Sequence, residues 1–88
     1  MENRKVTKTI KNQYGDIVAL CNDSEIWSPK LKSIAIPEIE LKINRYFVTI
    51  DNKEIDIQVV QNSSGGKMLI TNPYESNDNF LFSLPDSF

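Results

Sequence analysis

The segment 54–60 constrains the fold of this chain more than any other, because it alternates strictly between polar and apolar side chains. The apolar positions are Ile55, Ile57 and Val59, and the polar positions between them are Glu54, Asp56 and Gln58. Successive side chains of a β-strand point to opposite faces of the sheet. The pattern therefore predicts a strand with one face in a hydrophobic core and the other in solvent.

A turn joins this strand to the segment before it. Residues 45–50, RYFVTI, read as a strand, and the turn Asp51-Asn52-Lys53 follows. Asn52 tolerates the left-handed backbone conformation that tight turns need. Residues 45–60 are therefore predicted to form a β-hairpin.

An earlier hairpin is predicted from a basic strand and an apolar strand. Residues 5–11 alternate between two sides of a strand. One side carries Lys5, Thr7, Thr9 and Lys11 and is expected to face solvent, and the other carries Val6, Lys8 and Ile10 and is expected to be mostly buried. Residues 17–21, IVALC, are apolar on both parities, which is typical of a strand inside a sheet. Between them, Gly15 can take the positive φ that closes a hairpin.

A helix is predicted after residues 22–28, a loop that carries the only tryptophan, Trp27. Ser28 is a favoured N-cap and Pro29 a favoured first helical residue. Apolar side chains then recur every four positions, at Leu31, Ala35, Ile39 and Ile43, with Ile34 beside them. This spacing predicts a helix of about 14 residues with one core face. Because Pro37 removes a backbone hydrogen bond, we expect either a kink there or two short helical pieces, the second starting at Pro37.

The rest of the chain adds one strand and a tail. Residues 62–66 predict a flexible loop before a last strand at 67–71, and residues 72–88 predict irregular coil pinned by Phe80, Leu81 and Leu84. We thus expect a single domain over residues 1–88, with a core at about residues 5–71 and a tail at 72–88. The fold class is α+β: a small, mostly antiparallel sheet in β-β-α-β-β-β order, with one kinked helix on one face.

Charge and cysteine usage exclude several classes of protein. Twelve acidic residues outnumber ten basic ones, whereas nucleic-acid binders usually carry a basic excess, even though Arg4, Lys5, Lys8 and Lys11 crowd the first strand. The single cysteine, Cys21, cannot form an internal disulfide, and we expect it to pack in or beside the core. No stretch approaches the ~20 apolar residues of a membrane helix, and no signal peptide is expected. These features favour a cytoplasmic protein.

Several stretches of the chain together form a recognisable pattern: VTKTIKNQYGDIVAL, W-S-P-K with AIPEIE, RYFVTIDNKEIDIQVV, GGKMLIT and the closing N-F-L-F-S-L-P. In these stretches the chain resembles a family of short bacterial proteins known as domain-of-unknown-function family 3892. Together the stretches span nearly the whole chain, which departs from the family pattern at Pro37 and at 68–70. The resemblance implies the architecture described above. It carries no established activity to this chain.

No catalytic, cofactor or metal site is predicted. The chain has no histidine, which is the commonest general base and zinc ligand. Glu54 and Asp56 share the wet face of their strand, so we interpret them as solvated rather than as an acid–base or metal pair. The oxygen-rich segment 72–79 lacks the spacing of a calcium loop. Gly65-Gly66-Lys67 leads into a strand rather than into a phosphate-binding helix.

The aromatic side chains suggest what the protein does. Tyr46 and Phe47 are neighbours in one strand and point to opposite faces of the sheet. A single helix covers only one face, so the tail, a second copy of the chain or another partner is expected to cover the other.

We therefore expect a non-enzymatic, self-associating binding or assembly module, most simply a homodimer. The alternative is a binder of a small anionic, nucleotide-like ligand, held by basic side chains in a groove or at a subunit interface. A third hypothesis is single-stranded nucleic-acid binding, with Trp27 or Tyr46 stacked on bases. The candidate ligand or interface residues are Arg4, Lys5, Trp27, Arg45, Tyr46, Phe47 and Lys67, of which Arg4, Lys5, Arg45 and Lys67 serve the anionic alternative.

Overall fold

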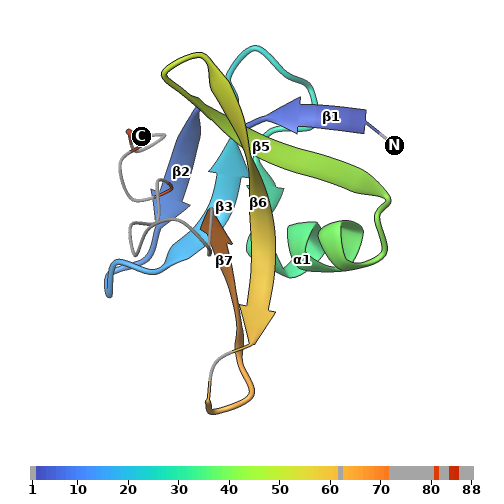
Figure 1. The fold of residues 1–88 in the computed structure, drawn as a ribbon. Coiled ribbons are helices and arrows are strands. Elements are labelled where there is room, and N and C mark those ends of the chain that lie inside the picture. Colours follow the sequence, from blue (N-terminus) through green and yellow to red (C-terminus); the bar gives the residue numbers. More distant parts are fainter. Residues whose placement is uncertain (1, 62, 72–80, 82–83, 86–88) are drawn as a thin grey trace.

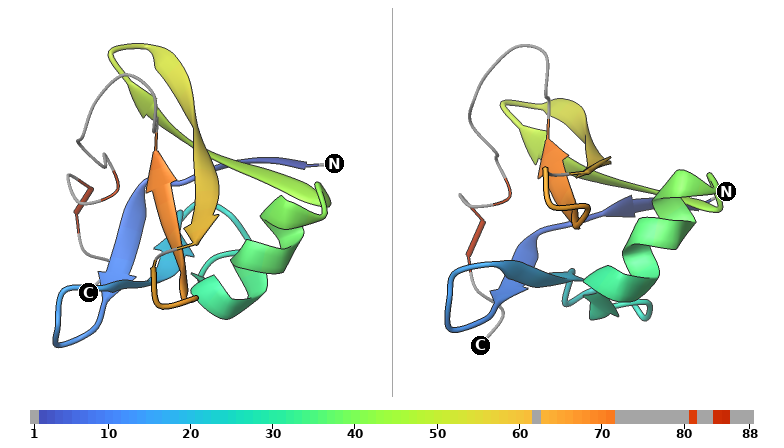
Figure 2. Two further views of the ribbon diagram at one scale, coloured as in Figure 1. Left: turned by 60° about the horizontal axis from the view of Figure 1, so that its bottom comes forward. Right: turned by 90° about the horizontal axis from the view of Figure 1, so that it is seen from below.

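The computed structural model describes residues 2–61, 63–71, 81 and 84–85. Its elements are β1 (Glu2–Lys5), β2 (Lys8–Lys11), β3 (Ile17–Cys21), β4 (Lys30–Leu31), α1 (Lys32–Glu40), β5 (Asn44–Ile50), β6 (Lys53–Gln61) and β7 (Lys67–Thr71) (Figure 1). One sheet has the strand order β1-β5-β6-β7, and the other has the order β2-β3-β4. Helix α1 packs beside both sheets (Figure 2). The α+β class is confirmed, with two small sheets in place of the one expected.

The predicted strand at residues 5–11 is wrong, because the chain changes sheets in its middle. β1 pairs with β5 in parallel, and β2 pairs with β3 antiparallel. Between them, the amide of Val6 donates to a carbonyl of β5, and the next amide, of Thr7, donates to a carbonyl of β3. Val6 and Thr9 are both buried, although one continuous strand would point them to opposite faces. The predicted division of this segment into a wet and a dry face therefore fails at Thr9.

The β2–β3 hairpin is confirmed, with a turn over residues 12–16. The Oδ1 atom of Asn12 accepts hydrogen bonds from the amides of Tyr14 and Asp16, at 2.9 and 3.0 Å. Gly15 has a φ of 83°, a conformation that glycine adopts without steric cost. β3 lies between β2 and β4, which confirms that the doubly apolar strand is internal to its sheet.

The β5–β6 hairpin is also confirmed. Asp51 and Asn52 have φ values of 51° and 65°, and two successive left-handed residues form the type I′ turn whose twist suits a hairpin. Lys53, expected in the turn, is the first residue of β6 and lies opposite Ile50.

The faces predicted for β6 are those observed. Ile57 is buried, and Ile55 and Val59 pack partly buried against the core. Glu54 and Asp56 are exposed. The last strand, β7, has the predicted bounds of 67–71 and pairs with the second half of β6, from Ile57 to Gln61.

Helix α1 is shorter than predicted, at nine residues. Ser28 is not its N-cap, because the Ser28 Oγ accepts a hydrogen bond from the amide of Asn22, and residues 30–31 form β4 beside β3. Pro37 lies inside the single helix, so the alternative of a second helix starting at Pro37 is wrong.

The helix ends in a Schellman motif at Lys42. The amide of Ile43 donates to the carbonyl of Glu38 at 2.8 Å, and the amide of Lys42 donates to the carbonyl of Ile39 at 3.1 Å. Lys42 has a φ of 57°, a conformation that glycine usually supplies at this position.

These bounds change which side chains face the core. Ala35 and Ile36 are buried, and Ile39 packs against the core. Leu31, Ile34 and Ile43 are exposed, so their predicted place on the core face is wrong. Leu31 and Ile43 lie beyond the ends of the helix, where the backbone no longer follows the helical period. Ile34 lies inside the helix but on its exposed side.

One hydrophobic core joins both sheets and the helix. Its buried members are Val6, Ile17, Leu20, Ala35, Ile36, Tyr46, Val48, Ile57, Leu69 and Leu81. Leu81 is buried and Leu84 packs against this cluster, which confirms for these two residues that the tail is pinned to the core. Phe80 and Phe82 lie outside the described residues. Cys21 is buried, as predicted.

Candidate functional site

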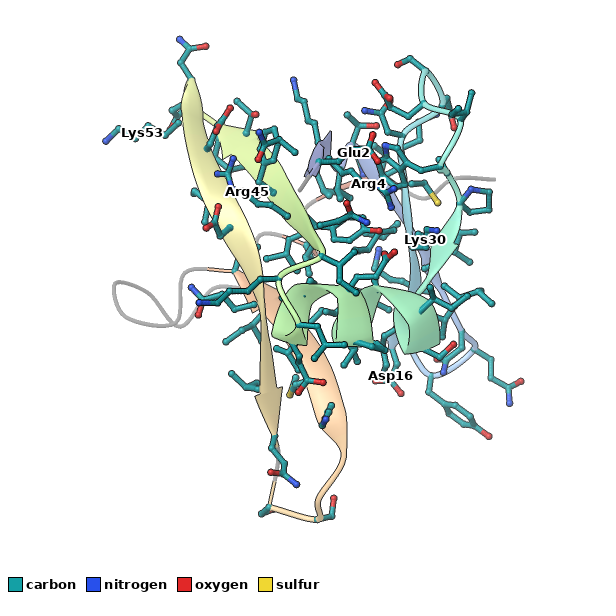
Figure 3. All side chains as sticks on the ribbon, turned by 90° about the vertical axis from the view of Figure 1, so that its right-hand side faces the viewer. Glu2, Arg4, Asp16, Lys30, Arg45 and Lys53 are labelled. Atoms are coloured by element: carbon teal, nitrogen blue, oxygen red, sulfur yellow. The ribbon has the colours of Figure 1, made fainter. Side chains whose placement is uncertain are left out.

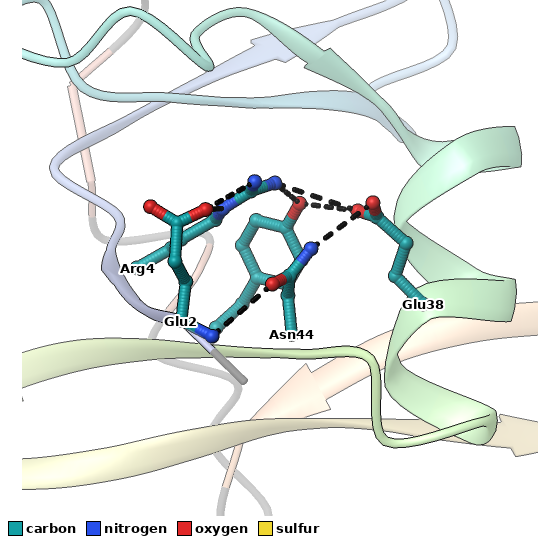
Figure 4. Close-up of polar contacts among 5 residues, drawn as sticks. Glu2, Arg4, Glu38 and Asn44 are labelled. Carbon is teal, nitrogen blue, oxygen red and sulfur yellow. Dashed lines mark hydrogen bonds and ion pairs between the residues drawn. The ribbon is translucent and has the colours of Figure 1, made fainter.

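Arg4, Glu38 and Tyr46 meet in a hydrogen-bonded network that joins β1, α1 and β5 (Figure 4). Arg4 lies opposite Tyr46 in the parallel β1–β5 pair, and its Nη1 donates to the Tyr46 hydroxyl at 2.7 Å. The same hydroxyl donates to Oε1 of Glu38 at 2.6 Å. Arg4 Nη1 also lies 3.6 Å from that Glu38 oxygen. Each of the three elements thus contributes one member of the network.

Glu2 and Asn44 complete this network at its rim. Nη2 of Arg4 donates to the Glu2 carboxylate at 2.7 Å. Asn44 donates through Nδ2 to Glu38 at 3.2 Å and accepts from the Glu2 amide at 3.2 Å. The Arg4 and Glu38 side chains are only 11% and 18% exposed. Within the described residues, every buried side-chain nitrogen and oxygen has a hydrogen-bond partner, so the buried charges are compensated within the chain.

The environment of Tyr46 keeps its hydroxyl protonated. The pKa of Tyr46 is raised to about 12: burial is the largest cause, the hydrogen bond to Glu38 acts in the same direction, and Arg4 opposes both. For Arg4, burial lowers the pKa, but the hydrogen bonds to Glu2 and Tyr46 outweigh burial and the net shift is upward. Neither side chain therefore changes its protonation near neutral pH.

Trp27 covers this network from the loop before β4. Its ring lies edge-on to the Tyr46 ring, with centroids 5.6 Å apart and an interplanar angle of 82°. The Arg4 guanidinium lies 5.7 Å from the Trp27 ring centroid and 5.6 Å from that of Tyr46. Cation–π contacts of this kind add to the ion pairs that hold Arg4 in place.

A second group of side chains occupies the other face of β5. The Arg45 guanidinium lies 4.6 Å from the Phe47 ring centroid. Arg45 donates through Nε to Asp56 at 2.6 Å and through Nη1 to Glu54 at 3.0 Å. The hydrogen bond to Asp56 is the main cause that raises the pKa of Arg45. The exposed acidic pair on β6 is therefore an ion-pair partner of β5.

An open cleft of about 240 Å³ lies where β5 and β6 separate, and we call it the β5–β6 cleft. Its lining residues are Ile39, Lys42, Asn44, Arg45, Tyr46, Asp56, Ile57 and Gln58. Figure 3 shows Arg45 between the ribbons of β5 and β6. The cleft thus combines an apolar floor with charged and amide groups at its rim.

The solvent side of the helix carries an unexpected apolar surface. We define the outer face of α1 as Leu31, Ile34, Pro37, Leu41 and Ile43, all of which are exposed. Leu31, Ile34, Leu41 and Ile43 are 54%, 48%, 70% and 52% exposed. Surface helices normally carry polar residues on this side.

The structure gathers some of the predicted site residues and separates others. Arg4, Trp27 and Tyr46 lie together in the buried network, and Arg45 and Phe47 lie together on the other face of β5. Lys5 is exposed at the end of β1. Lys67 forms an ion pair with Glu40 of α1 at 2.9 Å. The four basic side chains proposed for an anionic ligand therefore do not share one groove.

Sequence reasoning missed Glu38, Asn44 and Lys42 as site residues, and it missed the outer face of α1. Nothing local in the sequence links Glu38 to the first strand. A signal did exist for the outer face, because apolar residues fall on every side of the segment 31–43, which is unusual for a surface helix.

Metal and membrane sites receive no support from the described residues. They hold no group of three or more histidine, cysteine, aspartate or glutamate side chains placed to bind a metal ion. Within the same residues, no helix has both the length and the apolar character that crossing a bilayer requires.

No family model, curated protein or solved structure matches this chain.

Proposed function

We propose that the protein is a non-enzymatic, self-associating binding module, and that the outer face of α1 is the surface through which two copies pair. The observation that supports this proposal is the exposure of four large apolar side chains, Leu31, Ile34, Leu41 and Ile43, within or directly beside one helix. A contiguous apolar surface of this kind is typical of an interaction site.

A second copy of the chain suits this face because a two-fold pair presents the same apolar surface from both copies. Two helices that pack antiparallel about a two-fold axis bring the start of each beside the end of the other. Opposite ends of the two helix dipoles then face one another.

The exposed area indicates a weak dimer. The exposed area of the four large side chains is roughly that of two fully exposed side chains. Full burial of one such side chain contributes about 1.5–3 kcal/mol. Two copies together therefore gain about 6–12 kcal/mol, which is comparable to the ~4–15 kcal/mol that association costs in lost freedom. We expect a dissociation constant in the micromolar range or weaker.

The aromatic side chains first considered for an interface do not favour one. Tyr46 and Phe47 are only 1% and 7% exposed within one chain, so no second chain is needed to cover them. The same burial weakens the case for single-stranded nucleic-acid binding, because base stacking needs an exposed ring.

Sedimentation velocity over a range of micromolar concentrations tests this proposal. We expect the average mass to rise with concentration, and we expect Ile34→Glu to abolish the rise by placing a charge at the centre of the outer face. Tyr14→Ser is the matched control, because Tyr14 is 78% exposed in the β2–β3 turn, which lies away from α1 in both views of Figure 2. A mass fixed at 10.1 kDa, or association that survives Ile34→Glu, would contradict the proposal.

A further inference from the structure

The β5–β6 cleft exists because both strands change partners at the same place. The pairs between β5 and β6 run from Ile50–Lys53 to Phe47–Asp56. Beyond that point, β5 pairs with β1 over Asn44–Phe47, and β6 pairs with β7 over Ile57–Gln61. The two strands therefore part, and Ile39 from the last turn of α1 and Lys42 from the segment after it line the opening between them.

The polar groups around this cleft fall into two sets. Asn44 and Tyr46 each make hydrogen bonds within the buried network described above. The side chains of Lys42 and Gln58 make no hydrogen bond or ion pair to any described residue, although both line the cleft. Ile39 and Ile57 supply the apolar floor. The cleft thus offers a cation and an amide that the described part of the chain leaves unused.

The unpaired cation of the rim favours an anion. Arg45 is paired with both Asp56 and Glu54, so Lys42 is the cation of the lining that no described residue compensates. The Schellman motif occupies the carbonyls of Glu38 and Ile39, so these two oxygens at the helix end are turned to their amide donors rather than left free to repel an anion. Arg45 borders the cleft with its guanidinium bound to Asp56 through Nε and to Glu54 through Nη1, so it shapes the rim while Lys42 supplies the unpaired charge.

We propose that the β5–β6 cleft binds a small organic anion, with a carboxylate or phosphate group on Lys42 and an apolar body over Ile39 and Ile57. The Gln58 amide supplies a further hydrogen bond. The volume of about 240 Å³ equals roughly eight waters at ~30 Å³ each, and it falls below the usual ~300–1,000 Å³ of pockets for larger ligands. The site therefore suits a ligand the size of one substituted ring rather than a whole nucleotide.

The experiment is a titration followed by amide chemical shifts, with benzoate and phenyl phosphate as probes and benzyl alcohol as the neutral control. It is run in the Ile34→Glu background, because Leu41 and Ile43 flank Lys42 and self-association would affect the same amides. This separates failure of the cleft from failure of the proposed dimer. We expect saturable shifts at Lys42, Arg45 and Gln58 with one or both anions, and the tighter probe identifies a carboxylate or a phosphate as the preferred group.

Lys42→Gly removes the charge and keeps a residue that adopts the left-handed conformation, so it should weaken anion binding about tenfold without unfolding the helix end. Asn52→Gly is the matched control, because it places glycine at another left-handed position and leaves the cleft unchanged. The proposal is overturned if no shift saturates, if benzyl alcohol binds as well as the anions, or if Lys42→Gly binds them as tightly as Asn52→Gly.

Discussion

The guanidinium of Arg4 donates a 2.7 Å hydrogen bond to the hydroxyl of Tyr46, which in turn donates one of 2.6 Å to the carboxylate of Glu38. The hydroxyl thus lies between a buried cation and a buried anion whose direct separation is 3.6 Å. It links the parallel β1–β5 pair to the helix at Glu38, which lies one helical turn from both Ile34 and Leu41 of the outer face of α1. The orientation of α1 therefore depends on the Tyr46 hydroxyl, which accepts one hydrogen bond from Arg4 and donates another to Glu38.

Replacing Tyr46 with phenylalanine removes this link while keeping the ring. We expect Tyr46→Phe to lower the free energy of unfolding by about 1–3 kcal/mol, because it leaves buried hydrogen-bonding groups of Arg4 and Glu38 without their shared partner. Urea denaturation measures the change. Tyr14→Phe, at an exposed tyrosine, should change stability by less than ~0.5 kcal/mol. Equal effects of the two variants would show that the hydroxyl does not hold the helix.

The raised pKa of Tyr46 makes stability depend on pH in the alkaline range. The folded chain holds the Tyr46 proton to a pKa of about 12, against an ordinary value of 10.0. The stabilisation is fully present below pH 10 and is lost as the pH rises toward 12, because the unfolded chain releases this proton first. The loss amounts to at most about 2–3 kcal/mol. The difference in stability between the unmodified chain and Tyr46→Phe should therefore shrink over this range, and a difference that stays constant would contradict the assignment.

The alternation of β6 places Ile57 in the core, where it is 2% exposed. Ile57→Ala should lower the free energy of unfolding by about 2–4 kcal/mol, as deletion of a buried isoleucine side chain does. Ile26→Ala is the control, because Ile26 is fully exposed and should contribute less than ~0.5 kcal/mol. A loss at Ile57 no larger than at Ile26 would place the wrong face of β6 in the core.

The hairpins were predictable from the sequence because neighbouring residues decide them. The alternation of 54–60, the left-handed residue Asn52 and the glycine at Gly15 each act within a few positions, and all three features appear as expected. The split of the first strand could not be predicted in this way. It depends on Val6 pairing with one sheet and Thr7 with the other, which only the assembled fold decides.

Only some residues of the candidate site were predictable from the sequence. Arg4, Trp27 and Tyr46 stand out in the sequence as a basic and two aromatic residues, but their common partner Glu38 does not, because the contact joins the helix to the start of the chain. The helix bounds failed for a related reason. The Schellman motif is closed by Lys42 rather than by a glycine, so the usual stop signal of a helix is missing from the sequence.

The unusual residue at this helix end yields a further prediction. Lys42→Gly should raise the free energy of unfolding by about 0.5–1 kcal/mol, because a side chain is strained in the left-handed conformation and glycine is not. Lys53→Gly should instead lower it by about 0.5–1 kcal/mol, because Lys53 lies in a strand where glycine costs backbone entropy. Thermal and urea unfolding of the two variants would give opposite signs. A loss of stability in both would show that Lys42 is held there by its side chain.

Pro37 sits in the interior of α1, where it cannot donate a hydrogen bond to the carbonyl of Ser33. Pro37→Ala restores this donor and removes the clash of the ring with the preceding turn. Since the proline also restricts the unfolded chain, the two effects partly cancel, and we expect a net gain of about 1–2 kcal/mol. Pro37→Gly restores the same donor but should gain about 1 kcal/mol less than the alanine variant.

Both proline variants should be measured by urea denaturation in the Ile34→Glu background, because Pro37 belongs to the outer face of α1 and association would otherwise contribute to stability. A gain for alanine that exceeds the gain for glycine identifies the missing backbone hydrogen bond and the helix propensity at position 37 as the cause. A loss of more than ~1 kcal/mol in Pro37→Ala would instead mean that the fixed φ of proline is what defines the helix at this point. In that case the ring stabilises the outer face against fraying, and the apolar surface proposed for self-association depends on Pro37 directly.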